Sequence, residues 1–198
     1  MAVGLTVYGF GSYEAVTPAA TDTGSTTVQF WRLLAVGSGV LPVLTLAGSM
    51  TDLEAIGGRS YHRLRALVLG VAFVGSSACF LAAVAAGVGT SAMWQTARAL
   101  IAWFGIALVS GRVLGFTYAW LLPFATLCAM LYWGFDSDAG QYRWWEFTAQ
   151  PAGHPASGIL AIVLLVVGLA MFTSSPWRVY RLARFWALRR RTGSGVDR

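Results

Sequence analysis

Residues 156–175 decide the fold of this chain, because they read ASGILAIVLLVVGLAMFTSS and carry no charged side chain. A helix of about 20 such residues is about 30 Å long, which matches the thickness of the hydrocarbon core of a bilayer. The stretch is therefore predicted to cross a membrane as a helix.

Four more apolar stretches extend this prediction to most of the chain. They lie at about 30–50, 66–88, 96–111 and 116–134, and the third, which is the shortest, is expected to begin a few residues earlier. The composition agrees, with 57% hydrophobic and 11% charged residues, where soluble domains have about 25% charged residues. We predict an all-α fold, a polytopic transmembrane helical bundle of about five spans with a basic amphipathic C-terminal helix.

The bundle is predicted to occupy residues 30–175, between two flanking segments of different composition. Residues 1–29 are rich in Gly, Thr, Ser and Ala, which predicts a mostly irregular tail outside the cytoplasm. Residues 176–198 form a basic cytoplasmic tail. Within the bundle, Pro42 and Pro123 are expected to kink the first and fourth spans.

The arginines predict the orientation in the membrane. All 14 basic residues are Arg, and five spans place eleven of them on one side and only Arg32, Arg98 and Arg143 on the other. Because arginines accumulate on the cytoplasmic side, we expect a multi-pass protein of a bacterial plasma membrane with its N-terminus out and its C-terminus in. The bias also accounts for the net charge of +6, so no nucleic acid is expected as a partner, only membrane lipid and protein. Arg32 and Arg98 lie near span ends and are expected to extend their guanidinium groups to the headgroup region.

The residue types exclude several kinds of chemistry. The chain has only two histidines, which fall in loops on opposite faces, so no metal or haem site is expected. Without a lysine, the chain cannot form a phosphate-binding loop of the Walker type. No catalytic residue, cofactor or metal ligand is predicted, and the chain is not expected to be an enzyme.

Two regions are candidates for function. The outer loop contains a polar and aromatic patch, which is either an interfacial aromatic belt or a gate over the outer mouth of a transport path: Arg143, Trp144, Trp145 and Glu146. The inner side offers candidate contacts to a partner subunit: Asp52, Glu54, Arg59, Arg63, Arg65, Arg178, Arg181 and Arg184. The alternatives for the inner side are a solvated loop that only sets the topology and a tail that lies on the anionic leaflet.

Two segments resemble a known family. Residues 111–123 read GRVLGFTYAWLLP and residues 144–153 read WWEFTAQPAG. Together with the loop at 52–65, they resemble small actinobacterial membrane proteins related to ABC-2-type exporter permeases. Typical members have six spans and a cytoplasmic N-terminus, whereas five spans and an external N-terminus are predicted here.

The resemblance implies a membrane subunit of an ABC-type export complex, which would move a hydrophobic compound or peptide together with a separate ATPase and a second membrane subunit. The alternative is a non-catalytic accessory subunit of a larger respiratory or secretion complex, whose small-residue helices pack against partner spans. A third possibility, an enzyme acting on lipid, has only Arg143 and Glu146 as candidate residues.

Overall fold

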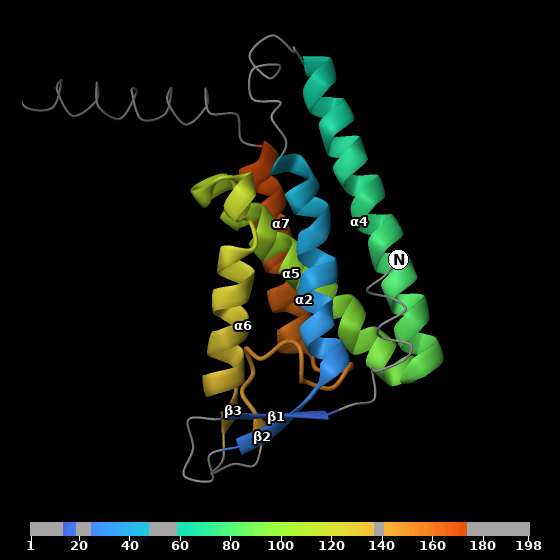
Figure 1. The fold of residues 1–198 in the computed structure, drawn as a ribbon, viewed down its shortest axis with the longest axis vertical. Coiled ribbons are helices and arrows are strands. Elements are labelled where there is room, and N and C mark those ends of the chain that lie inside the picture. Colours follow the sequence, from blue (N-terminus) through green and yellow to red (C-terminus); the bar gives the residue numbers. More distant parts are fainter. Residues whose placement is uncertain (1–13, 19–24, 48–58, 137–140, 174–198) are drawn as a thin grey trace, which may run out of the picture.

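The computed structural model describes residues 14–18, 25–47, 59–136 and 141–173 (Figure 1). The elements in chain order are β1 (Glu14–Pro18), β2 (Ser25–Gln29), α2 (Phe30–Leu44), η1 (Thr45–Ala47), α4 (Arg59–Gly87), α5 (Thr90–Leu114), η2 (Phe116–Tyr118), α6 (Leu121–Trp133), β3 (Phe135–Asp136), β4 (Gln141–Tyr142) and α7 (Pro155–Thr173). The strands β1 to β4 and residues 143–154 lie at one end of the bundle, which we call the loop end (Figure 1).

Five helical segments are long and apolar enough to cross a membrane. They are Phe30–Ala47, Arg63–Gly87, Thr90–Leu114, Phe116–Trp133 and Pro155–Thr173. They run alternately toward and away from the loop end (Figure 1). The predicted all-α bundle of about five spans is therefore confirmed, whereas the predicted basic C-terminal helix lies outside the described residues.

The turn between α4 and α5 is tighter than the sequence indicated. A link at 89–95 was expected, but α5 already begins at Thr90, so only Val88 and Gly89 separate the two helices. Gly89 has a φ of 122°, a conformation that costs glycine little and other residues much more. The earlier start of the third span, which was expected, is confirmed.

Residues 14–18 and 25–29 are not part of an irregular tail, as their composition predicted, but form strands. β1 and β2 form an antiparallel hairpin whose register runs from Glu14 opposite Gln29 to Pro18 opposite Ser25. The strands contain Val16, Thr17, Thr26, Thr27 and Val28, and β-branched residues favour extended backbone. The flanking Gly and Ser residues masked this local signal. The first 13 residues lie outside the described part.

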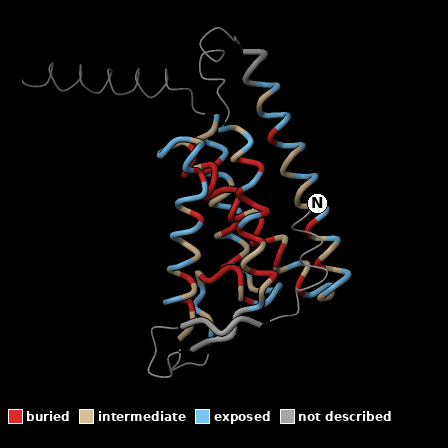
Figure 2. Tube along the Cα trace, in the orientation of Figure 1, coloured by how far each residue is buried: buried red, intermediate tan, exposed pale blue. Residues whose placement is uncertain are grey.

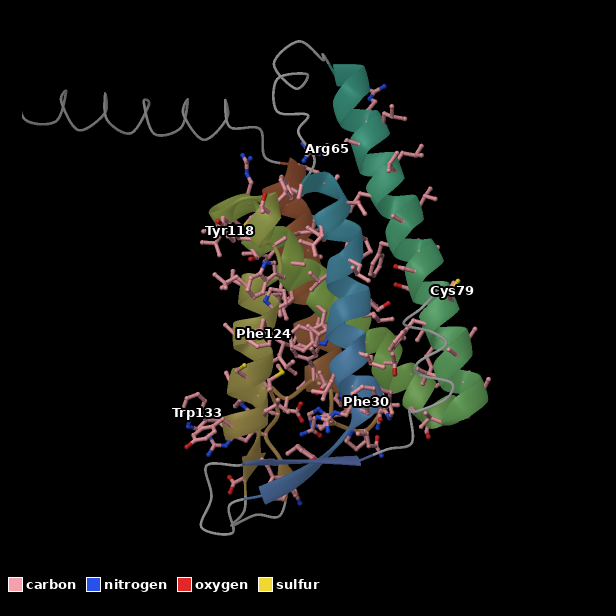
Figure 3. All side chains as sticks on the ribbon, viewed as in Figure 1. Phe30, Arg65, Cys79, Tyr118, Phe124 and Trp133 are labelled. Carbon is pink, nitrogen blue, oxygen red and sulfur yellow. The ribbon has the colours of Figure 1, made fainter. Side chains whose placement is uncertain are left out.

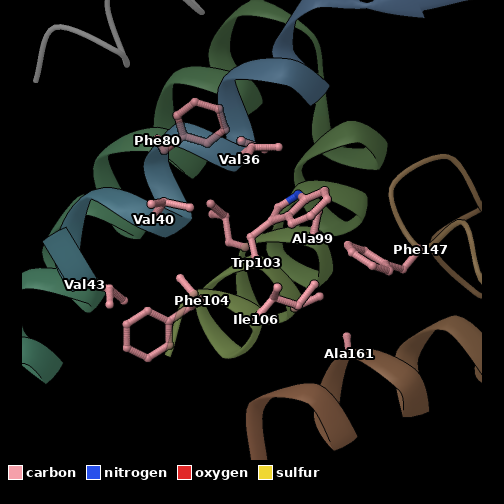
Figure 4. Close-up of a cluster of buried hydrophobic side chains, with 14 of the residues drawn as sticks. Val36, Val40, Val43, Phe80, Ala99, Trp103, Phe104, Ile106, Phe147 and Ala161 are labelled. Atoms are coloured by element: carbon pink, nitrogen blue, oxygen red, sulfur yellow. The ribbon is translucent and has the colours of Figure 1, made fainter. Parts of the chain in front are cut away.

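Helix α5 is the centre of the bundle. In α5, 67% of the most apolar window is buried. The corresponding share is 17% in each of the spans formed by α4, by η2 with α6, and by α7. In Figure 2 the buried positions accordingly concentrate on α5 and on the faces turned toward it. Trp103 of α5 is fully buried and packs edge-on against Phe147, with ring centroids 5.0 Å apart (Figure 4).

Helix α7 presents its smallest residues, not its largest, to α5. Its buried residues are Ser157, Ala161 and Gly168, while Ile159 and Ile162 are exposed. This is the pattern of a membrane helix, because lipid solvates large apolar side chains and small residues allow the backbones to approach. A Cβ atom on Gly168 would lie 2.5 Å from the carbonyl oxygen of Gly105, so the two backbones are in direct contact.

Pro123 does not kink the fourth span. It is the third residue of α6, in the first turn, where a backbone N–H has no partner within the helix and the ring of proline is tolerated. The expected kink at this position is therefore wrong. Pro42 lies two residues before the end of α2, after which the chain continues as the short 3-10 helix η1.

Exposed aromatic side chains gather at both ends of the bundle. Tyr118 and Trp120 are exposed at one end, and Trp94, Trp133 and Trp144 are exposed at the loop end. Figure 3 shows Tyr118 and Trp133 near opposite ends of the bundle. Trp and Tyr prefer the two membrane–water interfaces, so these residues mark the two edges of the hydrocarbon layer.

The contact between Gly105 and Gly168 gives the first prediction. Gly105→Ala would place a Cβ atom 2.5 Å from the carbonyl oxygen of Leu164, and such overpacking costs about 1–3 kcal/mol. We expect a lower midpoint of thermal unfolding in detergent, followed by the loss of the monodisperse peak in gel filtration. The control is Gly75→Ala in α4, where a Cβ atom meets nothing within 4 Å. Equal midpoints for the two variants would contradict the close packing of α5 and α7.

Candidate functional site

Residues 134–136 and 141–154 fold back onto the loop end of the bundle. β3 and β4 form a two-residue antiparallel ladder, and the backbone N–H of Arg143 donates to the carbonyl oxygen of Gly134 at 2.9 Å. The chain then turns inward at Glu146, whose N–H donates to the carbonyl oxygen of Arg143 at 2.9 Å. Gly134 leaves room for this turn, because a Cβ atom there would lie 2.7 Å from Cγ of Glu146.

Arg32 holds this segment through its side chains. Nη2 of Arg32 donates to Oε1 and Oε2 of Glu146 at 2.8 and 3.0 Å, and to Oγ1 of Thr148 at 2.8 Å. The hydroxyl of Thr148 in turn donates to Oε1 of Glu146. Glu146 is only 2% exposed and Arg32 only 8%. The first turn of α2 is thus joined to a residue 114 positions further along the chain.

Arg98 of α5 holds the same segment through its backbone. Its Nε donates to the carbonyl oxygen of Phe147 at 3.0 Å, its Nη1 to that of Pro151 at 2.9 Å, and its Nη2 to that of Gln150. The side chain of Gln150 then closes the loop, because its Nε2 donates to the carbonyl oxygens of Tyr142 and Arg143 at 2.6 and 3.1 Å. We call Arg32, Arg98, Glu146 and Thr148 the arginine clamp.

The arginine clamp corrects one expectation from the sequence. Arg32 and Arg98 were expected to extend to the headgroup region, but each is 8% exposed and bonded to the chain. An arginine side chain is long enough either to reach the headgroup region or to bond within the protein. Its distance from the span end therefore does not distinguish the two arrangements. The sequence did carry one indication of these contacts. A guanidinium group close to an apolar span requires an acidic or carbonyl partner, and few such partners lie nearby in the sequence.

The electrostatics of the clamp are dominated by burial. Burial raises the pKa of the Glu146 carboxyl above its ordinary value, while the charge of Arg32, the hydrogen bonds from Thr148 and Arg32 and the charge of Arg98 act in the opposite direction. The ring of Tyr142 lies over the guanidinium group of Arg32, with 5.4 Å from Cζ to the ring centroid. Two guanidinium groups and one carboxyl group are therefore held within the protein at the edge of the bundle.

The four candidate gate residues occupy three different environments. Arg143 and Trp144 are exposed, Trp145 is half-buried and lines a groove described below, and Glu146 belongs to the arginine clamp. The structure thus places them in one loop without joining them into one cluster. Arg32, Arg98 and Thr148, which surround Glu146, were not among the residues selected from the sequence.

The candidate partner contacts lie at the other end of the bundle, as far as they are described. Arg63 is exposed on α4. Nη2 of Arg65 is 3.5 Å from the carbonyl oxygen of Leu46, and its Cζ lies 4.8 Å from the ring centroid of Phe116. Arg59 is the first residue of α4, and the remaining candidates lie outside the described residues: Asp52, Glu54, Arg178, Arg181 and Arg184. Their role as partner contacts stays a prediction.

An apolar groove lies between α6 and α7. Both helices pack against α5 and hardly against each other, which leaves a cavity of about 360 Å³. Its lining comes from α5, α6, α7 and the loop: Ile106, Val109, Leu122, Thr126, Met130, Trp145, Phe147, Leu160 and Leu164. We call this the α6–α7 groove. Its lining contains no titratable side chain, and within the described ranges no three His, Cys, Asp or Glu residues are grouped as metal ligands.

Removal of one partner of the clamp is expected to destabilise the fold. Arg32→Met leaves the carboxylate of Glu146 buried without its main counter-charge, which typically costs about 3–5 kcal/mol. The double variant Arg32→Met/Glu146→Met is expected to recover part of this loss, because both charges are then removed. The control is Arg143→Met, since Arg143 is exposed in the same loop. Thermal unfolding midpoints in one detergent measure all three, and a double variant less stable than Arg32→Met would contradict the pairing.

The raised pKa of Glu146 gives a prediction with a defined sign. Because the folded pKa lies above the unfolded one, the folded chain binds more protons between the two values. The free energy of unfolding is therefore expected to decrease as pH rises through this window, and Glu146→Gln is expected to flatten that dependence. Infrared spectroscopy of the protonated carboxyl band measures the pKa directly. Arg32→Met is expected to raise it further, and a lower value in that variant would contradict the assignment.

Known proteins supply no further guide to these features. No protein-family model, curated protein or solved structure matches this chain. The arginine clamp and the α6–α7 groove are therefore the features on which a proposal about function has to rest.

Proposed function

We propose that this chain is a membrane subunit of an ABC-type export complex, which moves a hydrophobic compound or peptide with a separate ATPase and a second membrane subunit. The observation that carries the proposal is the α6–α7 groove, an apolar cavity of about 360 Å³ within a bundle of five apolar helices. Ligand sites are typically concave, mostly apolar and of about 300–1,000 Å³. The groove is therefore large enough to take part in binding a hydrophobic molecule.

The lining of the groove favours a hydrophobic cargo over an ionic one. Thr126 contributes its only polar side chain, beside aliphatic and aromatic residues such as Leu160 and Trp145. A path for ions or protons normally carries charged or titratable groups within the membrane. The titratable groups of the arginine clamp lie outside the groove. Arg32 is paired with Glu146, and Arg98 donates to backbone carbonyl groups.

The energy for transport has to come from another subunit. The chain contains no lysine, and the phosphate-binding loop of ATPases of the Walker type requires one. A separate ATPase on the cytoplasmic side meets this need, and the resemblance of residues 111–123 and 144–153 to exporter permeases supports the same assignment.

The distribution of exposed arginines supports the proposed orientation in a bacterial plasma membrane. At the loop end, Arg32 and Arg98 serve the arginine clamp, so only Arg143 of the three remains exposed. The predicted topology assigns the other eleven arginines to the opposite side of the membrane. With the structural arginines set aside, the bias toward the opposite side becomes steeper, which supports a cytoplasmic position for that side and an external loop end.

The alternative function, a non-catalytic accessory subunit, is favoured by one specific observation. Helix α4 has 29 residues, and its first turns extend beyond the end of α2 (Figure 1). Large apolar side chains are exposed along it, including Leu64, Leu67 and Val71. Such a face is suited to lateral contact with a span of another subunit.

Copurification tests the proposal directly. The tagged chain, isolated from its native membrane in a mild detergent, is expected to bring down a nucleotide-hydrolysing subunit. Arg63→Glu reverses an exposed charge at the proposed cytoplasmic side. Because this charge is proposed to contact the ATPase, the yield of copurified ATPase is expected to fall. Arg143→Glu is the matched control, because it reverses an exposed charge at the loop end. Isolation of the chain without any ATPase, or together with a respiratory or secretion complex, would reject export and favour the accessory role.

A further inference from the structure

We propose that the α6–α7 groove binds one acyl chain of a phospholipid from the leaflet at the loop end, with the phosphate of its headgroup beside Arg143. This site does not depend on an ATPase partner, and it goes beyond the proposed export function. The groove lies at the outside of the bundle. α6 and α7 are outer helices of the bundle, with exposed residues such as Phe124 and Ile162, so the gap between them faces the lipid.

The length of the groove is close to that of one acyl chain. Along α6 its lining runs from Met130 near the loop end to Leu122, which is about 12 Å at the rise of a helix. One leaflet contributes about 15 Å of hydrocarbon, half of the bilayer core. The lining on α7, Leu160 and Leu164, belongs to the half of that helix nearer the loop end, whereas Ile106 and Val109 of α5 extend the groove past the middle of the bundle. The groove therefore runs along the direction that an acyl chain of that leaflet takes.

The width of the groove favours an occupant narrower than a helix. A cavity of about 360 Å³ spread over about 12 Å leaves a channel about 6 Å across, whereas a helix with its side chains is about 10–12 Å wide. A single hydrocarbon chain is narrow enough to enter. In the nearly uninterrupted apolar lining, such a chain keeps an apolar environment like that of the bilayer and gains van der Waals contacts with ordered side chains.

The loop end supplies the charge for a headgroup. Trp145 lines the groove at this end, and the exposed Arg143 and Trp144 precede it in the same loop. Trp side chains prefer the headgroup level, and a guanidinium group pairs well with a phosphate. Arg143 is the exposed arginine at the loop end among the described residues, because Arg32 and Arg98 are occupied in the clamp. A phosphate there would therefore meet a free positive charge.

Photolabelling of the purified chain tests the site. The chain is reconstituted in phosphatidylcholine vesicles that contain a small fraction of phosphatidylglycerol with a diazirine on one acyl chain, and adducts are mapped by peptide mass spectrometry. We expect adducts to concentrate on groove residues such as Thr126 and Met130 rather than on the exposed Ile162 and Val166. Equal labelling of the groove and of the exposed faces would show only bulk lipid and would overturn the proposal.

Substitutions separate the chain site from the headgroup site. Thr126→Trp fills the groove and is expected to reduce labelling at Met130 at least about tenfold, because several methylene groups lose their contacts. Phe124→Trp, on the exposed face of the same helix, is expected to leave it unchanged. Leu160→Trp fills the groove from α7 and serves as a second variant if Thr126→Trp fails to give a monodisperse chain. Unchanged labelling in a folded groove variant would overturn the proposal.

The headgroup assignment has its own readout. Arg143→Ser is expected to remove the preference for the phosphatidylglycerol probe over a diacylglycerol probe with the same diazirine chain, which lacks the phosphate, while the groove remains labelled. A retained preference would overturn the assignment to Arg143. Crosslinks from Thr126 to another polypeptide in native membranes, together with no lipid adducts in the purified chain, would assign the groove to a partner and reject the lipid site. None of these readouts uses an ATPase, so a failure here leaves the test of export untouched.

Discussion

The ion pair between Arg32 and Glu146 is the constraint on which the arrangement of the loop end depends. A charged group taken out of water must be paired and hydrogen-bonded, or it costs several kcal/mol. Arg32 lies in the first turn of the first span and Glu146 lies between the fourth and fifth spans, so their pairing brings distant parts of the chain together. Arg98 adds hydrogen bonds to three carbonyl groups of the same loop. The bonds to Phe147 and Gln150 are buried, so these two carbonyl groups are satisfied without water.

The α6–α7 groove follows from two different modes of packing on the same central helix. α7 approaches α5 closely because Gly105 and Gly168 lie backbone to backbone. α6 carries larger residues and starts late in its span, after the 3-10 turn η2. The loop held by the arginine clamp joins the ends of these two helices and places Trp145 and Phe147 at one end of the gap. The clamp and the groove are thus parts of one arrangement, in which the polar contacts at the membrane edge set the position of an apolar cavity.

The sequence predicted the spans well, and it predicted the site poorly, for one physical reason. A membrane span is a local property, since about 20 apolar residues satisfy the bilayer wherever they occur. Residues 156–175 show this, and α7 lies within one or two residues of that stretch. The pairing of Arg32 with Glu146 joins positions 114 residues apart, and no local pattern contains it. The hairpin of β1 and β2 was missed because the glycines and serines of residues 1–29 concealed two short β-branched segments.

Arginines in a membrane protein do not all carry the same information. Those exposed outside the spans report topology, because their distribution reflects insertion, whereas Arg32 and Arg98 are consumed by internal contacts. Counting all three arginines of the loop end therefore understates the bias, and it hides the single residue, Arg143, that remains free to meet an external charge. The same separation bears on the two proposed functions. An accessory subunit needs only apolar faces such as that of α4, whereas a subunit that handles hydrophobic molecules needs an apolar cavity, such as the groove between α6 and α7.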